Sequence, residues 1–213
     1  MSEHHYLKNA RLVGRQLRQV AELDGQWVAL IGWNVAAYHL KGRESWIGWD
    51  TAQLLKRRKF VVQNSRFLLL TDRGRYPNLA SRVLALSCNR LSSDWEKANG
   101  YPVLAVESFV DPERFSGACY RAAGWERLGQ TKGSRRHHRD FYLHDATPKE
   151  LWVRSLHPKA RKWLSSSNLP QRYKQHEDPA MYCPFSSSQF RSLWHRFNSL
   201  ADSRKSKGLL HRQ

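Results

Sequence analysis

Apolar residues follow two different spacings along the first two thirds of the chain. Spacings of three and four residues are typical of helices, whereas dense runs of Val, Ile, Leu and Phe are typical of buried strands. The spacing predicts helices over residues 6–22, 51–58 and 79–95. The dense runs predict strands over residues 27–40, 46–49, 60–70, 103–110, 127–131 and 139–144, with a hairpin-like connection at 41–44. This alternation predicts an α/β fold with one mixed sheet flanked by helices.

The pattern changes near residue 146. The following stretch contains four prolines and a run of three serines at 165–167. We expect a linker there, with one short helix over 148–154. The chain is therefore expected to have three parts, which cover residues 1–145, 146–182 and 183–213.

The last part is expected to contain an amphipathic helix. Ser186 and Gln189 form a capping box at its start. Its apolar face carries Phe190, Leu193, Trp194 and Phe197. An exposed apolar face of this kind favours a protein partner.

Charge narrows the range of partners. The 213 residues include 36 Lys and Arg but only 18 Asp and Glu, which gives a net charge of +18. Such an excess favours polyanions, and we expect DNA. No stretch approaches the ~20 apolar residues that span a bilayer, and the first residues lack an apolar signal core. We therefore expect a cytoplasmic protein without a membrane segment, whose three widely spaced cysteines are reduced.

Two basic runs are candidates for contacts with DNA phosphates. The first consists of Arg57, Arg58 and Lys59, and the second of Lys132, Arg135, Arg136 and Arg139. His137 and His138 have no acidic or thiol partner at metal-ligand spacing, so we expect no metal site. Both runs would make binding fall steeply with salt. The alternative for the second run is an exposed, solvated hairpin tip.

Residues 101–125 carry the most informative pattern of the chain. An apolar strand that contains Glu107 stops at Asp111-Pro112, a pair that can open a helix. Tyr120 then lies four positions before Gly124. This arrangement is typical of the closing half of an acyltransferase core.

The segment and the order of elements are similar to the GNAT N-acetyltransferase fold. In an enzyme of that kind, the resemblance implies that Tyr120 is a general acid and that Glu107 deprotonates an amine. Two other roles remain open. Tyr120 is then a buried aromatic whose hydroxyl is satisfied locally, and Glu107 pairs with an arginine.

The same resemblance implies a phosphate-binding loop at residues 75–80. GNAT proteins bind the pyrophosphate of coenzyme A with the motif Arg/Gln-x-x-Gly-x-Gly/Ala. Arg75 and Ala80 fit its ends, but Asn78 replaces the middle glycine and Pro77 precedes it. Asn78 can adopt left-handed backbone angles but adds bulk. We therefore expect no cofactor, with a coenzyme A thioester as the alternative.

Two further resemblances concern mobile elements and phage defence. Residues 7–145 resemble the Druantia anti-phage protein A (DruA) domain, known from phage defence and from the N-termini of some transposases. The similar segments are residues 32–38, 46–49, 64–68, 78–81, 107–125 and 128–133. Residues 183–211 resemble the N-terminal helical region of H-repeat-associated transposases, in which a DDE nuclease follows.

These observations predict a nucleic-acid-associated accessory domain of a transposase-related or phage-defence protein, without the nuclease. The alternative is an acyltransferase that uses coenzyme A on an amine. A second alternative is a truncated fragment without activity.

Overall fold

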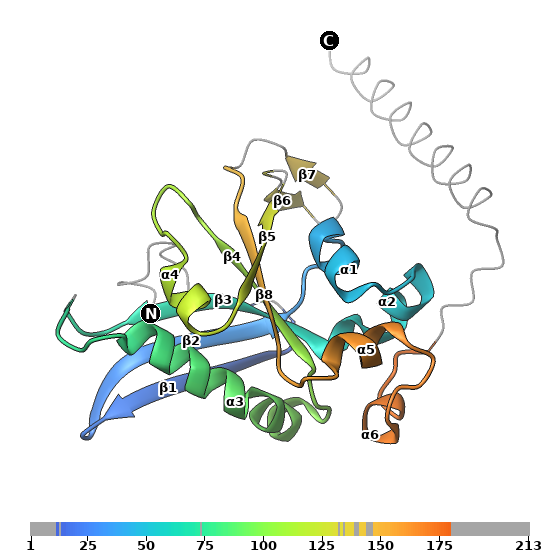
Figure 1. Cartoon of the computed structure of the whole chain (residues 1–213), viewed down its shortest axis with the longest axis horizontal. Helices are drawn as coiled ribbons and strands as arrows, with labels where there is room; N and C mark the ends of the chain where they lie inside the picture. The colour runs from blue at the N-terminus through green and yellow to red at the C-terminus, as the bar shows by residue number, and fades with distance from the viewer. Residues whose placement is uncertain are drawn as a thin grey trace, which may run out of the picture. The chain divides into compact units, whose positions relative to one another are not determined.

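The computed structural model describes residues 12, 14–72, 74–131, 133, 135–138, 141–143 and 147–179 (Figure 1). The chain divides into two compact units, Met1–Pro179 and Ala180–Gln213. All described residues belong to the first unit. The predicted amphipathic helix lies outside them.

A six-stranded mixed sheet forms the centre of the first unit. Its strands lie in the order β1-β2-β3-β4-β8-β5. Their bounds are β1 Gln16–Leu23, β2 Gln26–Val35, β3 Val61–Leu69, β4 Ala105–Val110, β5 Glu126–Gln130 and β8 Glu150–Ser155. β3 and β4 are parallel, and the other neighbours are antiparallel. A separate hairpin joins β6 (Arg135–His138) to β7 (Phe141–Leu143).

Helices flank this sheet (Figure 1). Their bounds are α1 Lys41–Ile47, α2 Thr51–Arg57, η1 Arg58–Phe60, α3 Leu79–Asn99, α4 Ala118–Ala122, α5 Ala160–Ser165 and α6 Gln171–Lys174. The longest, α3, buries Val83, Leu84, Cys88, Leu91 and Trp95 at spacings of three and four residues. This apolar stripe explains why the segment is helical and which face meets the core. None of the described helices has the length and apolar character needed to cross a membrane.

Most elements follow the sequence pattern. The expected helices at 51–58 and 79–95 correspond to α2 and α3, and three expected strands correspond to β3, β4 and β5. The predicted α/β class, with a mixed sheet flanked by helices, is confirmed.

The helix expected over residues 6–22 is wrong where the structure describes it. Residues 16–23 form β1, whose side chains alternate between exposed and half-buried. The turn at Asp24 and Gly25 joins β1 to β2 as a hairpin. Leu17 and Val20 are three residues apart, a spacing that favours a helix, but in β1 they lie on opposite faces, with Leu17 half-buried and Val20 exposed.

The strand expected over residues 46–49, and the hairpin before it, are also wrong. This segment belongs to α1, which buries Arg43, Trp46 and Ile47 on one face. Gly48 ends α1 in the left-handed conformation, with φ of 76°. Glycine adopts this conformation without steric cost and commonly follows the last helical residue.

The linker expected over residues 146–182 is wrong for its described part. Residues 150–155 form β8, which lies between β4 and β5 in the sheet. Leu151, Trp152 and Val153 are all buried, as expected for an inner strand covered on both faces. The prolines lie between elements and do not interrupt them. The compact unit therefore extends well beyond residue 145, and the helix expected over 148–154 is this strand.

The helix that carries Tyr120 begins later than Asp111-Pro112 suggested. Residues 112–114 form a turn, and α4 follows Gly117. Gly117 has φ of 70°, and an added Cβ would collide with the indole ring of Trp152. Only glycine fits here, because both the backbone angle and the close approach exclude a side chain.

Gly117→Ala should therefore destabilise the fold strongly. We expect a loss of about 2 to 4 kcal/mol in the free energy of unfolding, from the left-handed backbone and the collision together. Gly124→Ala is the matched control, since Gly124 has φ of 75° but open space around it. Its loss should stay near 1 to 2 kcal/mol, roughly the backbone cost alone. Urea denaturation measures both, and equal losses would contradict the packing argument.

Candidate functional site

Strands β3 and β4 part at a polar fork. Their parallel ladder ends with the pair Asn64 and Ser108, although β3 continues to Leu69. The Tyr120 hydroxyl donates to Asn64 Oδ1 at 2.7 Å, and Ser108 Oγ lies 3.0 Å from the same hydroxyl. Ser108 Oγ is also 3.1 Å from the Asn64 carbonyl oxygen. The side chains of Asn64, Ser108 and Tyr120 thus form one hydrogen-bonded group, which we call the fork cluster.

Aromatic rings enclose the fork cluster. The ring of Tyr120 lies 5.0 Å from Trp125, edge to face, and 6.2 Å from Trp152. Tyr120 is 8% exposed, and both tryptophans are buried. Its proton already points to Asn64, so donation to a substrate would first break a buried hydrogen bond. The arrangement matches the alternative in which Tyr120 is a buried aromatic satisfied locally.

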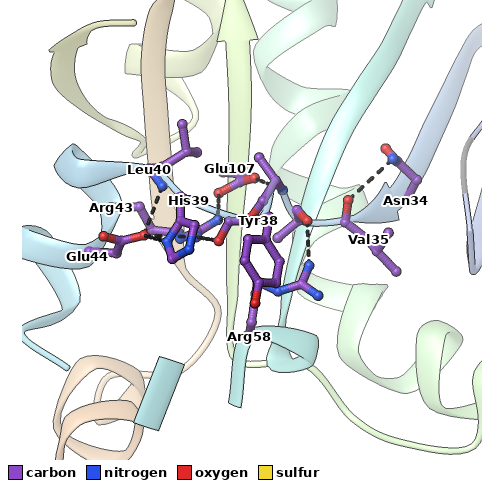
Figure 2. A network of polar contacts seen from close by, with 11 residues as sticks. Asn34, Val35, Tyr38, His39, Leu40, Arg43, Glu44, Arg58 and Glu107 are labelled. Atoms are coloured by element: carbon purple, nitrogen blue, oxygen red, sulfur yellow. Dashed lines mark hydrogen bonds and ion pairs between the residues drawn. The ribbon is translucent and has the colours of Figure 1, made fainter. Parts of the chain in front are cut away.

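Glu107 lies in a second buried network (Figure 2). Its Oε2 accepts from Arg43 Nη1 at 2.8 Å, and its Oε1 accepts from the Ala37 amide at 2.8 Å. Neither charged side chain is exposed to solvent. The Glu107 carboxylate is thus enclosed in the core and paired on both oxygens, with no exposed surface. The arginine pairing left open by the sequence is the one observed.

The same network fixes the connection from β2 to α1. Arg43 Nη1 donates to the Ala37 carbonyl at 2.8 Å, and Arg58 Nη1 donates to the Ala36 carbonyl at 2.9 Å. Glu44 Oε1 accepts from the Leu40 amide at 2.9 Å. Side chains thus satisfy backbone groups that would otherwise be left unpaired in a partly buried loop.

The loop before α3 retains part of a phosphate-binding geometry. Asn78 adopts the left-handed conformation, with φ of 56°, as its sequence position suggested. The amides of Ala80 and Ser81 lie in the first turn of α3, where helical amides lack intrahelical partners. Arg75 is exposed, with its guanidinium 5.4 Å from the Tyr76 ring centroid. The Arg75 guanidinium and these amides are donors of the kind that bind a phosphate group.

The cysteines of the described chain are not nucleophiles. Burial raises the pKa of the Cys88 thiol to about 11. Burial also raises the pKa of Cys119. Both thiols therefore stay protonated at neutral pH, as expected for small core residues. The described residues contain no cluster of three or more His, Cys, Asp or Glu side chains that could hold a metal ion.

The first basic run does not form a free cationic surface. Arg57 is buried, donates to Glu177 at 2.5 Å and also holds the carbonyls of Trp163 and Leu164. Arg57 was therefore wrongly assigned to phosphate contacts, because its partners come from a distant segment that folds back onto it. Lys59 pairs with Asp178 at 2.6 Å. Arg58 lies 4.9 Å from the Tyr38 ring centroid and holds the loop described above.

The second basic run lies outside the described side chains. Lys132 and Arg139 are not described, and only the backbone of Arg135 and Arg136 is described, in β6. Their assignment to DNA contacts stays a prediction.

A third group of cations was missed by sequence reasoning. Lys159, Arg161 and Lys162, which we call the α5 cluster, are all exposed. In the part of the chain that the structure describes, none of the three has an acidic partner. Arg161 lies 5.1 Å from the Trp46 ring centroid. These residues form a dense basic run in the sequence, but the run lies in the segment that the sequence predicted to be a linker.

A comparison with family models shows the family to which this chain belongs. The family model of Druantia protein DruA matches residues 1–164. The chain belongs to the DruA family. The match includes β8 and most of α5, so the DruA domain extends past the boundary expected at residue 145. The chain thus carries a phage-defence-related domain.

Solved acetyltransferase structures resemble the DruA domain at low identity. Aminoglycoside acetyltransferase AAC(6')-Ib with coenzyme A is 19% identical, with a TM-score of 0.45 over 70% of this chain and 69% of that chain. Its complex with coenzyme A and kanamycin is 18% identical, with a TM-score of 0.44 over 70% of each chain. A GNAT superfamily phosphinothricin acetyltransferase from Sinorhizobium meliloti is 15% identical, with a TM-score of 0.37 over 65% of this chain and 60% of that chain. At these identities and TM-scores the similarities carry no argument about the activity of this chain. No curated protein sequence matches the chain.

Tyr120→Phe distinguishes a structural tyrosine from a catalytic one in this DruA domain. Loss of the hydroxyl leaves Asn64 Oδ1 without its buried donor, and we expect a loss of about 1 to 3 kcal/mol in unfolding free energy. Tyr38→Phe, at a ring that is 48% exposed, is the control and should cost less than about 0.5 kcal/mol. Both are measured by urea denaturation. Unchanged stability of Tyr120→Phe would refute the structural role.

Proposed function

We propose that this DruA-family chain is a DNA-binding accessory domain of a phage-defence or transposase-related protein. The observation that carries the proposal is the α5 cluster, three exposed cations without acidic partners in the described chain. Phosphate contacts of this kind supply most of the affinity in sequence-independent DNA binding.

The distribution of acidic side chains supports the proposal. Many of them pair with cations within the fold, namely Glu96, Glu107, Asp111, Glu150, Glu177 and Asp178. Because these carboxylates are engaged, they do not neutralise exposed cations elsewhere. The whole chain has a net charge of +18, and an excess of this size attracts a polyanion.

The contacts of the two catalytic candidates also favour a binding function over catalysis. Tyr120 donates to Asn64, and Glu107 is paired with Arg43 in the core. Coenzyme A-dependent acylation of an amine remains the second candidate, since Asn78 is left-handed and precedes the free amides of α3. Ala80 and Ser81 would hold the pyrophosphate of the cofactor, which would supply the activated acyl group.

Removal of the α5 cluster tests the proposal. In the full chain with Lys159, Arg161 and Lys162 changed to Ala, DNA affinity should fall at least tenfold near 0.1 M salt, roughly the effect of losing two or three phosphate contacts. The slope of log K against log salt should become shallower by about 0.9 for each lost contact. Fluorescence anisotropy with labelled duplex and single-stranded DNA, at two salt concentrations, measures both quantities.

A control variant that loses the same number of positive charges distinguishes direct contacts of the α5 cluster from the effect of net charge on DNA binding. Arg90, Arg127 and Arg172 are each paired with a carboxylate, and their change to Ala removes three charges elsewhere. This control should bind DNA nearly as tightly as the unaltered chain. Acetyl-coenzyme A titrated by calorimetry tests the second candidate. Cofactor binding without salt-dependent DNA binding, or no binding of either, would overturn the proposal.

A further inference from the structure

In the part of the chain that the structure describes, strand β1 forms an open edge of the sheet. It is eight residues long, its one described partner strand is β2, and it lies beside α3 at the margin of the sheet (Figure 1). Proteins commonly protect such edges with prolines, β-bulges, charged side chains or a covering segment. The register shift in this hairpin leaves Val28 of β2 as the extra residue, so β1 itself runs regularly. An edge of this length is therefore suited to pairing with another strand.

The hairpin turn determines which backbone groups of β1 are free. Asp24 and Gly25 have φ of 51° and 74°, and Leu23 faces Gln26 across them, as in a type I′ turn. Leu23 is then a hydrogen-bonded partner of Gln26, so alternate residues of β1 direct their amide and carbonyl groups to β2. The intervening residues Arg18, Val20 and Glu22 direct theirs to the open edge.

The side chains of these three residues are self-complementary. Val20 is 48% exposed, and Arg18 and Glu22 are exposed on either side of it. When two copies of β1 pair antiparallel with Val20 opposite Val20, each Arg18 lies opposite Glu22 of the other copy. Opposite charges that face each other across strands stabilise the pair, whereas like charges destabilise it. A twofold arrangement uses this complementarity twice.

The surface between β1 and α3 also favours the antiparallel register with Val20 opposite Val20. An apolar groove of about 770 Å³ runs between β1 and α3 and includes Leu17, Leu23 and Leu86. Leu86 is 64% exposed, which is unusual for a leucine on a core-facing helix. The antiparallel register sets Leu17 opposite Leu23 of the second copy, so apolar contacts accompany the backbone pairing on the α3 side.

From these observations we propose that the chain forms a twofold dimer in which β1 pairs antiparallel with β1 of a second copy, Val20 opposite Val20. The sheets of the two copies then join into one. This inference goes beyond the proposed function and does not depend on DNA binding.

Charge reversal tests the register directly. In the full chain, freed of nucleic acid by nuclease, Arg18→Glu places two carboxylates opposite each other at both ends, and Glu22→Arg places two guanidiniums there. Each single variant should weaken dimerisation roughly tenfold. The double variant Arg18→Glu/Glu22→Arg should restore it. An equimolar mixture of the two single variants should form heterodimers, because each Glu then faces an Arg. Analytical ultracentrifugation measures all four samples.

A proline variant supplies a control that does not depend on charge. Val20→Pro removes an amide that faces the open edge, so it should block the dimer, while circular dichroism should show the fold retained. A chain that stays monomeric at its highest soluble concentration would overturn the proposal. An oligomer that survives Arg18→Glu, Glu22→Arg and Val20→Pro unchanged would use another surface and would overturn it equally.

Discussion

The buried ion pair between Arg43 and Glu107 is the constraint on which the rest of the structure depends. It joins α1 to β4, two elements from distant parts of the sequence, with no exposure of either charge. Burial of a charge is costly unless polar partners accompany it, and here the Ala37 amide and the carbonyls of Ala37 and Tyr38 also form hydrogen bonds to the pair. Because these partners come from the β2–α1 connection, the ion pair fixes that loop as well as the helix (Figure 2). The central strand, the loop and α1 are therefore held as one framework.

The two residues that the sequence offered as catalytic candidates are both engaged in contacts that stabilise the fold. Glu107 is neutralised by Arg43, and the proton of Tyr120 is directed at Asn64 within the fork cluster. At the surface, many carboxylates are engaged in ion pairs, whereas the cations of the α5 cluster have no acidic partner among the described residues.

The sequence predicted those parts of the fold in which local pattern and tertiary burial agree. The long apolar stripe of α3 and the dense apolar runs of β3 and β4 left little ambiguity. β1 was misassigned because the three-residue spacing of Leu17 and Val20 fits a helix, whereas in the strand these two side chains lie on opposite faces. β8 was misassigned because prolines on either side of it outweighed the short apolar run at 151–153. The specific partners of polar residues that lie far apart in the chain could not be predicted from the sequence. Arg57 stands in a basic run that looks exposed, and only its contact with Glu177 reveals a buried structural role. The basic residues of the α5 cluster are evident in the sequence, but their exposure on a folded element is known only from the structure.

A double-mutant cycle on Arg43→Met and Glu107→Gln, followed by urea denaturation, tests the central role of the ion pair most directly. Each single variant leaves a buried group without its partner, so each should lose about 3 to 5 kcal/mol of unfolding free energy. The double variant should lose clearly less than the sum, because the second change removes the group that the first left unpaired. Losses below about 1 kcal/mol for the single variants, in the range of an exposed pair, would contradict this account. Strictly additive losses would contradict it as well.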